Sequence, residues 1–498
     1  MTARLLMPRT VTAFFFPLFL GWSATASDLA SQLSALIDRP AFAQAQWGVK
    51  ICDLGTGAIL FARNPDKLLK PASNAKMYTA ALALDRLGPD FRIETSCYAA
   101  AAPDAQGVIH GDLVVYGRGD PSFSARFNDG DYSKALTPML DAMAKAGIKK
   151  VEGDLVGDDS YFTGPPYGAD WTWDDLENYY GAPASALTFQ DNVIDLEFRP
   201  GDYDKPCQIV TLPETSFEIF SNLTTTGPAN IPEWNHIRIY TPLGGNVSYV
   251  WGQLPTNGPS HTDAVPVGHP ALWFVTMLKD ELIRRGIEVG GKVRSVNWIE
   301  QRSAPIEISK MVRVAFTQSR PLAEIVKQTL KPSENLYAQL LLLQVGAHAR
   351  LMAPHTTEEE GMTEMRRFLK QVGIGDDDTL LEDGSGLSRG SLVTPSASVQ
   401  LLRFIAHHKA SQAFYDALPI AGVDGTLRGR LKGTAAARNV HAKTGSLQYV
   451  DTLSGYLTNK AGEKLVFSIM LNNYRAPSGG PSGRAAIDGL VKTLAESP

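Results

Sequence analysis

Three short segments hold residue types that can act together as a nucleophile, a base and an anion-binding group. The first is Ser73-Asn-Ala-Lys76, at the start of a predicted helix. Because positions i and i+3 lie on one helix face, the hydroxyl and the amine can meet. Burial or a second cation lowers the pKa of a lysine, which lets it take the serine proton. This is the serine–lysine form of an activated nucleophile, although a helix N-cap beside a solvated lysine has the same pattern.

The second segment, Ser333-Glu334-Asn335, lies between two predicted helices and precedes four consecutive leucines. Its hydroxyl could pass protons, and its carboxamide could hold both a lysine and a substrate amide. The plain alternative is a helix N-cap followed by an acidic first turn.

The third segment, Lys443-Thr444-Gly445-Ser446, lies in a predicted strand. The lysine would supply a cation for a substrate carboxylate, and the threonine a second hydrogen bond. Gly445 has no side chain to block a ligand at the strand edge, although a glycine-containing strand end is the simpler interpretation.

In this order the segments form the S-x-x-K, S-x-N and K-T-G set of penicillin-recognising serine enzymes. Lys76 and Ser333 are 257 positions apart, which is more than a compact β-lactamase needs. The chain resembles the D-alanyl-D-alanine carboxypeptidase/endopeptidase family, the class C low-molecular-mass penicillin-binding proteins or peptidase family S13. The segments that carry the resemblance are Pro71–Lys76, Gly117–Pro121, Gly153–Phe162, Ser319–Leu322, Ser333–Ala338, Asp383–Ser388 and His441–Gly445.

The resemblance implies a serine peptidase mechanism. Ser73 would attack the carbonyl of a terminal D-Ala-D-Ala or of a peptide cross-link, and Lys76 would take its proton. Ser333 would relay a proton to the leaving amine. Water would then hydrolyse the acyl-enzyme, and a β-lactam would mimic the substrate and stall at that ester.

The resemblance also implies the substrate contacts. Asn335 would orient the substrate amide, and Lys443 and Thr444 would bind the terminal carboxylate. The backbone N–H groups of Ser73 and Ser446 would form the oxyanion hole.

An acidic residue of an inserted domain would face the amino end of the stem-peptide diamino acid. In this chain that role falls on Asp158 or Asp159. A turn aspartate that caps its own backbone is an equal alternative.

The elements around these motifs predict an α+β protein. Residues 47–60 read as a β-hairpin and residues 71–87 as a helix. Residues 91–168 have the texture of short strands, and residues 171–251 are rich in aromatics, Pro and Asn with little helical periodicity. Helices and strands return towards the C-terminus, so an α+β domain is interrupted by a β-rich insertion.

The resemblance makes this division explicit. It implies a penicillin-binding domain of residues 27–90 and 300–498, with an antiparallel sheet covered by helices. Nested inside it would lie one inserted domain of residues 91–168 and 241–299, and a second of residues 169–240.

The N-terminus has the layout of a secretory signal peptide. Arg4 and Arg9 precede the apolar run 11–22, and Ala24-Thr-Ala26 is a cleavage site, so residues 1–26 would be removed. An uncleaved anchor is the alternative. We therefore expect a periplasmic or secreted protein.

The composition of the chain limits which kinds of partner and cofactor it is expected to bind. The chain is 44% hydrophobic and 20% charged with a formal net charge of −5, which predicts a soluble globular protein without attraction to nucleic acid. Cys52, Cys97 and Cys207 allow at most one disulfide, or are three small buried hydrophobes. No metal-ligand spacing occurs, and no cofactor is expected.

The predicted function is therefore a serine DD-peptidase that acts on peptidoglycan stem peptides and is inhibited by β-lactams. The alternatives are a β-lactamase, esterase or D-amino-acid amidase of the same superfamily, and a non-enzymatic wall-binding or β-lactam-sensing protein. Loose membrane or wall association and a homodimer stay open.

Overall fold

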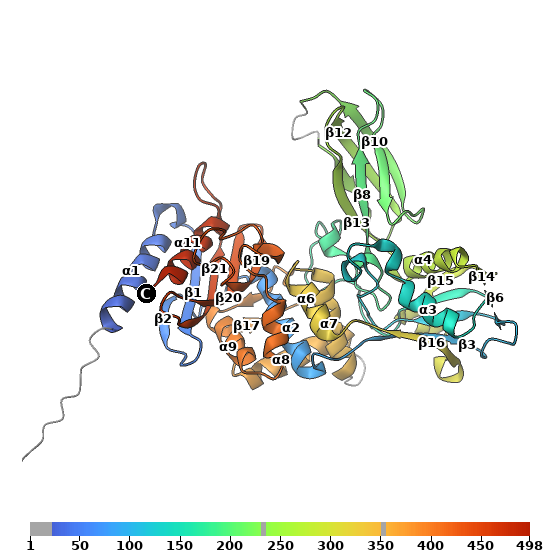
Figure 1. Cartoon of the computed structure of the whole chain (residues 1–498), viewed down its shortest axis with the longest axis horizontal. Coiled ribbons are helices and arrows are strands. Elements are labelled where there is room, and N and C mark those ends of the chain that lie inside the picture. The colour runs from blue at the N-terminus through green and yellow to red at the C-terminus, as the bar shows by residue number, and fades with distance from the viewer. Residues whose placement is uncertain (1–21, 231–235, 350–354) are drawn as a thin grey trace, which may run out of the picture.

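The computed structural model describes residues 22–230, 236–349 and 355–498. In Figure 1 the two ends of the chain, blue and red, lie side by side in one part of the molecule, and the middle of the chain forms the rest. Most of the predicted signal segment, residues 1–21, lies outside the described residues. Within those residues, no helix has the length and apolar character needed to cross a membrane.

The two chain ends share a five-stranded antiparallel sheet of order β19-β20-β21-β1-β2. Strands β1 and β21 pair along their whole length although more than 400 positions separate them. Eight of the nine residues of β21 are buried, because helices cover both faces of the sheet. The strands are β1 Gln46–Asp53, β2 Ile59–Arg63, β19 His441–Leu447, β20 Val450–Thr458 and β21 Lys464–Asn472.

Two helices at the ends of the chain cover one face of this sheet, and six others cover the opposite face. Helix α7 is buried on all sides over most of its length, as its four leucines predict. On the first face lie α1 Trp22–Ile37 and α11 Gly483–Glu496. On the second lie α2 Ala75–Leu87, α6 Leu322–Leu330, α7 Asn335–Ala349, α8 Thr357–Val372, α9 Pro395–Ala406 and α10 Ser411–Ala417, with the short strands β17 Thr379–Leu380 and β18 Leu392–Val393 nearby.

The first inserted part is a five-stranded sheet of order β15-β7-β5-β3-β16, accompanied by a three-stranded sheet, β14-β6-β4. Its elements are β3 Glu94–Ala99, β4 Val108–Ile109, β5 Leu113–Tyr116, α3 Thr137–Lys145, β6 Lys150–Val151, β7 Leu155–Asp158, α4 Pro270–Arg284, β14 Glu288–Val289, β15 Val293–Val296, α5 Trp298–Ser303 and β16 Val312–Gln318. Because β16 pairs with β3, this sheet extends beyond the predicted boundary at residue 299.

The second inserted part holds two three-stranded sheets, β13-β8-β9 and β10-β12-β11, which project from the molecule in Figure 1. Its strands are β8 Val193–Arg199, β9 Gln208–Leu212, β10 Ile219–Gly227, β11 Arg238–Tyr240, β12 Val247–Pro255 and β13 His261–Pro266. Strands β12 and β13 pair with β10 and β8, so the predicted boundary at residue 240 also falls short. Val312 of β16 pairs with Ala99, 213 positions away, whereas Val247 of β12 pairs with Ile219, 28 positions away.

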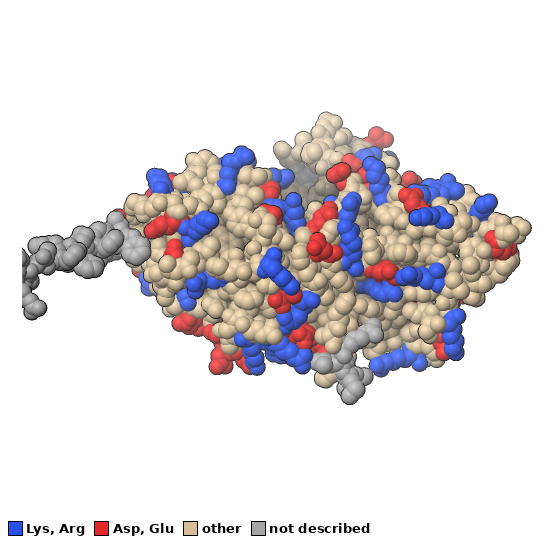
Figure 2. Space-filling model, turned by 60° about the horizontal axis from the view of Figure 1, so that its bottom comes forward, with Lys and Arg blue, Asp and Glu red and all other residues tan. Residues whose placement is uncertain are grey.

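Surface charge and cysteines agree with a globular protein. Figure 2 shows lysine and arginine interspersed with acidic residues over the face in view. All three cysteines are buried and unbridged, so they behave as small apolar residues.

Candidate active site

The three sequence motifs meet at one cleft of about 730 Å³ between the terminal sheet, its helices and the inserted parts. Ser73, Ser333, Asn335, Thr444, Gly445 and Ser446 line it, as predicted. Its other lining residues are Asp174, Asp175, Tyr179, Tyr180, Pro332, Gly386, Leu387, Arg389, Thr426, Arg430, Leu447, Gln448 and Arg484.

The nucleophile candidate Ser73 lies in a short 3₁₀ turn, η2 Ala72–Asn74, that leads into α2. Strand β19 packs directly against this turn. A Cβ on Gly445 would lie 2.3 Å from Thr452 Oγ1 and 2.6 Å from the Pro71 carbonyl oxygen. Gly445 is therefore required by the protein's own backbone, in addition to any ligand that approaches the strand.

The Lys76 side chain is fully buried, one helical turn from Ser73. Its Nζ lies 2.9 Å from Ser73 Oγ, 2.5 Å from Asn335 Oδ1 and 2.8 Å from the Ser385 carbonyl oxygen. Burial lowers the Lys76 pKa to about 8, although the carboxylates of Asp383 and Glu334 oppose that shift. The last two partners can only accept hydrogen bonds. A neutral amine would give both its hydrogens to them and keep its lone pair for the Ser73 hydroxyl.

Lys443 lies beneath the cleft and does not line it. Its Nζ donates to Ser333 Oγ and to the Thr444 carbonyl oxygen, each at 2.8 Å. Burial lowers the Lys443 pKa well below its ordinary value, and the charge of Lys76 adds to the shift. Ser333 has a φ of 70°, so the backbone itself aims this hydroxyl. The structure therefore pairs Lys443 with Ser333, whereas Thr444 faces the cleft and bonds Thr426 Oγ1 at 2.7 Å.

Asn335 is held with a single orientation of its amide. Its Oδ1 accepts from Lys76, and its Nδ2 donates to the Tyr180 carbonyl oxygen at 2.8 Å. Tyr180 belongs to the inserted segment, in the 3₁₀ turn η5 Tyr179–Gly181. The insertion therefore contacts a side chain that touches the candidate base.

Asp158 and Asp159 do not line this cleft. Asp158 ends β7 with no exposed surface, and its Oδ1 accepts the Ser160 N–H at 3.0 Å. Asp159 Oδ2 accepts from Ser185 Oγ at 3.0 Å beside a separate pocket of about 370 Å³. Burial raises the pKa of both, that of Asp159 to about 7. For Asp158 the contact to Ser160 two positions on matches the turn aspartate, the alternative that the sequence left open.

The acidic residues that do line the cleft are Asp174 and Asp175. Asp175 is buried, forms an ion pair with Arg389, and accepts from Thr172 Oγ1 at 2.7 Å. The sequence holds only one weak signal for this pair, an Asp-Asp step in an aromatic stretch. Arg389 lies between β17 and β18, in the part of the chain that forms the terminal sheet and its helices. Its ion pair with Asp175 therefore links that part to the inserted segment across the cleft.

A second contact from the insertion supports the loop below Lys76. Trp171 Nε1 donates to Asp383 Oδ2 at 2.8 Å, and Asp383 Oδ1 accepts the Gly386 N–H at 2.9 Å. These bonds fix the loop whose Ser385 carbonyl oxygen holds Lys76. Asp383 thus acts by shaping the loop beside the site.

The third contact is a charge network around Glu334, between Ser333 and Asn335. Arg126 of the insertion donates to Asp191 Oδ2 at 2.6 Å and to Glu334 Oε2 at 3.2 Å. Burial raises the pKa of Glu334, and the Asp191 carboxylate adds to the rise, whereas Arg126 opposes it. The cation therefore keeps two half-buried carboxylates together behind the motif.

Replacing Arg126 by alanine is expected to destabilise the fold by about 3 kcal/mol, because it leaves these two carboxylates without their cation. The measurement is the free energy of unfolding in urea. The matched control is Arg199→Ala, whose exposed pair with Glu197 should contribute less than about 0.5 kcal/mol. Equal losses in the two variants would contradict this interpretation.

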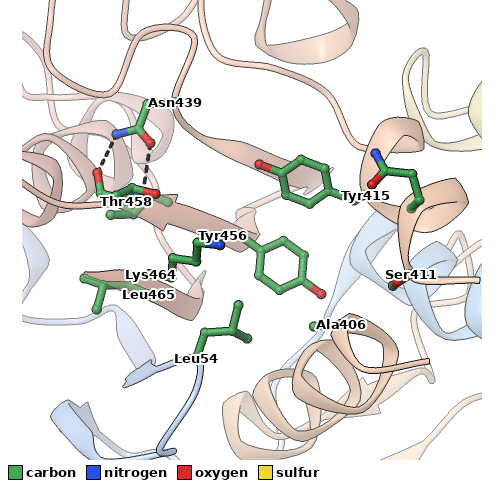
Figure 3. Close-up of a pocket in the computed structure, with 11 residues that line it drawn as sticks. Leu54, Ala406, Ser411, Tyr415, Asn439, Tyr456, Thr458, Lys464 and Leu465 are labelled. Atoms are coloured by element: carbon green, nitrogen blue, oxygen red, sulfur yellow. Dashed lines mark hydrogen bonds between the residues drawn. The ribbon is translucent and has the colours of Figure 1, made fainter. Parts of the chain in front are cut away.

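Another pocket, of about 300 Å³, lies between the far end of β20 and α10 (Figure 3). Tyr415, Tyr456 and Leu54 form much of its wall. Asn439 uses both ends of its amide on the Thr458 backbone, at 2.6 and 2.9 Å. Its lining holds no nucleophile with a base beside it, so the Ser73 cleft is the candidate active site.

Comparisons with known proteins agree with this geometry. A model of the D-Ala-D-Ala carboxypeptidase 3 (S13) family matches residues 29–494. The D-alanyl-D-alanine carboxypeptidase of Actinomadura sp. (strain R39) is 32% identical over 503 residues, which covers 99% of this chain and 89% of that protein. D-alanyl-D-alanine carboxypeptidase DacB of Haemophilus influenzae is 29% identical and covers 85% of this chain and 84% of its own length.

Solved structures give the same result. The crystal structure of penicillin binding protein 4 (dacB) from Haemophilus influenzae matches with a TM-score of 0.77 and 27% identity, over 94% of this chain and 98% of that chain. That protein has also been solved complexed with a novel β-lactam, and this structure matches with a TM-score of 0.72. The predicted α+β fold with inserted domains is confirmed.

Proposed function

Because the chain belongs to the D-Ala-D-Ala carboxypeptidase 3 (S13) family of serine-type carboxypeptidases, we propose that it cleaves D-Ala-D-Ala ends and cross-links of peptidoglycan through an acyl-enzyme on Ser73. The observation that carries the proposal is the 2.9 Å contact between Ser73 Oγ and the buried Nζ of Lys76. A serine hydroxyl needs such a base to become a nucleophile.

Acylation begins when neutral Lys76 takes the Ser73 proton and Ser73 Oγ bonds to the carbonyl carbon of the penultimate D-Ala. The developing oxyanion would meet the backbone N–H groups of Ser73 and Ser446, whose segments pack together at Gly445, where a Cβ would lie 3.0 Å from Ser73 N. Asn335, locked by Lys76 and Tyr180, would hold the substrate amide.

The leaving amine needs a proton as the C–N bond breaks. The Ser333 hydroxyl, bonded to Lys443 Nζ, is the group we assign to relay the proton held by Lys76 to this amine, which leaves Lys76 neutral again. Water then attacks the ester, and Lys76 again serves as the base. A β-lactam would form the same ester, which is consistent with the β-lactam complex of the Haemophilus influenzae relative.

The amino end of the stem-peptide diamino acid is assigned to Asp174 instead of Asp158 or Asp159, because Asp174 is exposed in the cleft, whereas Asp175 is buried and paired with Arg389. Asp175 and Asp174 line the cleft, and the other two aspartates do not. Export by the N-terminal segment stays part of the proposal, since the substrate lies outside the cytoplasm.

The direct test is release of D-Ala from diacetyl-L-Lys-D-Ala-D-Ala, together with muropeptide analysis of cross-linked peptidoglycan. Intact mass after incubation with benzylpenicillin should give a single lasting adduct. Rapid penicillin turnover without an adduct would favour a β-lactamase. If the protein neither forms an adduct nor turns over penicillin, the assigned nucleophile is wrong.

The pH dependence of acylation tests the base. Lys76 acts when deprotonated, so the acylation rate should rise about tenfold per pH unit below pH about 8 and level off above it. Glu334 raises the Lys76 pKa, so Glu334→Gln should move this limb to lower pH. The measurement is the second-order acylation rate from pH 6 to 10. A flat profile, or a shift of the limb to higher pH in the variant, would contradict the role of Lys76.

A further inference from the structure

The cleft contains cationic side chains that no sequence motif indicated. Three arginines line the cleft among the residues that the structure describes: Arg389, Arg430 and Arg484. Two of them are neutralised at close range. Arg389 pairs with Asp175, and Arg430 makes a two-pronged contact with Asp488, with Nη2 2.7 Å from Oδ1.

Arg484 differs from these two in exposure and in partners. Its side chain is 64% exposed, against 35% for Arg389 and 16% for Arg430. Its Nε lies 3.5 Å from Asp451 Oδ1, and its Nη2 donates to Ser446 Oγ at 3.2 Å. A guanidinium has five N–H donors, so several remain available towards the cleft.

The position of Arg484 is fixed by the fold. It is the second residue of α11, and Asp451 approaches the start of that helix so closely that a Cβ on Gly483 would lie 2.4 Å from Asp451 Oδ2. Asp451 faces Ser446 across the β19–β20 pair and accepts its hydroxyl at 2.6 Å. Asp451 therefore orients both Ser446 and the guanidinium from behind.

The cation expected from the sequence to meet the substrate carboxylate was Lys443. Lys443 has no exposed surface, and its amine is occupied by Ser333 and the Thr444 carbonyl oxygen. Burial also lowers its pKa well below the ordinary value, which makes it a weaker source of positive charge than an exposed arginine. The positive charge for the substrate carboxylate then has to come from an exposed cation that lines the cleft near this strand.

We propose that Arg484 is the residue that binds the carboxylate of the leaving group, beside the paired hydroxyls of Thr444 and Thr426. This inference rests on the proposed function. It makes Arg484 a specificity-determining residue, because it separates leaving groups with a carboxylate next to the scissile bond from neutral ones. Charge-assisted hydrogen bonds from a planar guanidinium suit a carboxylate.

The test compares two activated acyl donors, N-benzoyl-D-alanyl thioglycolate and its thioglycolamide, which differ only in the leaving-group charge. In Arg484→Ala, kcat/KM for the thioglycolate should fall about tenfold to a hundredfold, and that for the amide should change less than about twofold. Arg484→Lys keeps the positive charge but loses the planar guanidinium, so its kcat/KM for the thioglycolate should lie between the values of wild type and Arg484→Ala. Thiol release is the readout for both donors.

Arg475→Ala is the matched control, since Arg475 is exposed in the preceding loop and does not line the cleft. It removes the same charge and should leave both rates unchanged. Equal losses on the two donors in Arg484→Ala, or no loss on either, would overturn the inference. If wild type formed no acyl-enzyme with either donor or with benzylpenicillin, the proposed function would fail instead. Should Arg484→Ala not fold, Arg484→Gln replaces it with the same criteria.

Discussion

Ser73→Ala is expected to remove the benzylpenicillin adduct completely and to lower peptide hydrolysis by about 10⁴-fold or more. The reason is that Ser73 Oγ is the hydroxyl within hydrogen-bonding distance of the Lys76 amine in the cleft. The measurement is intact mass after incubation with benzylpenicillin, followed by D-Ala release from diacetyl-L-Lys-D-Ala-D-Ala.

The control for this variant is Ser411→Ala. Ser411 lies at the start of α10 and lines the other pocket of the same domain, so both activities should survive. The Ser73 variant should also unfold within a few degrees of wild type, since the change removes one hydroxyl. An adduct that persists in folded Ser73→Ala would mean that a different nucleophile operates.

The sequence predicted the residues of the site better than the borders of the domains. Ser73 and Lys76 belong to one four-residue motif, and helix geometry alone brings the hydroxyl and the amine together. Ser333 and Lys443 also came from short motifs, although their contact spans 110 positions and needs the fold. Strands β16 and β12 join sheets across the predicted borders at residues 299 and 240, because a strand pattern does not identify which strand will be its neighbour.

Two residues had no usable signal in the sequence. Arg484 follows a Gly- and Ser-rich stretch and is the second residue of the last helix, and Asp175 lies in an aromatic stretch of the insertion. Each gains its place through a pair with a residue far away, Asp451 and Arg389 respectively. The two aspartates that the resemblance suggested lie away from the cleft, where Asp158 accepts the Ser160 N–H and Asp159 accepts the Ser185 hydroxyl.

Residues of the insertion support three side chains of the candidate active site. Tyr180 holds the amide of Asn335, Trp171 holds Asp383, and Arg126 holds Glu334. Asn335 contacts Lys76 directly, Asp383 bonds the Ser385 residue whose carbonyl oxygen contacts Lys76, and Glu334 acts on Lys76 through its charge. A peptidase that used the terminal sheet and its helices alone would lack the Tyr180 contact that orients Asn335 and the Arg126 cation that partners Glu334.

Lys76→Met is expected to lower the acylation rate by about 10³-fold, within the range of a lost general base. Methionine keeps much of the buried volume but cannot accept a proton, so the residual rate should also lose its rise with pH below about 8. The measurement is the second-order rate with benzylpenicillin between pH 6 and 10.

Lys443→Met separates the two buried lysines. It should also slow acylation, because Ser333 loses its partner, but the rise with pH should persist since Lys76 keeps its contacts. Lys76→Arg adds a second distinction, as arginine keeps the cation but does not deprotonate in a protein. A Lys76→Arg variant that acylates like wild type would show that the charge of Lys76 matters and its basicity does not. If the rise of the acylation rate below about pH 8 disappeared in Lys443→Met and persisted in Lys76→Met, the base would be Lys443 and not Lys76.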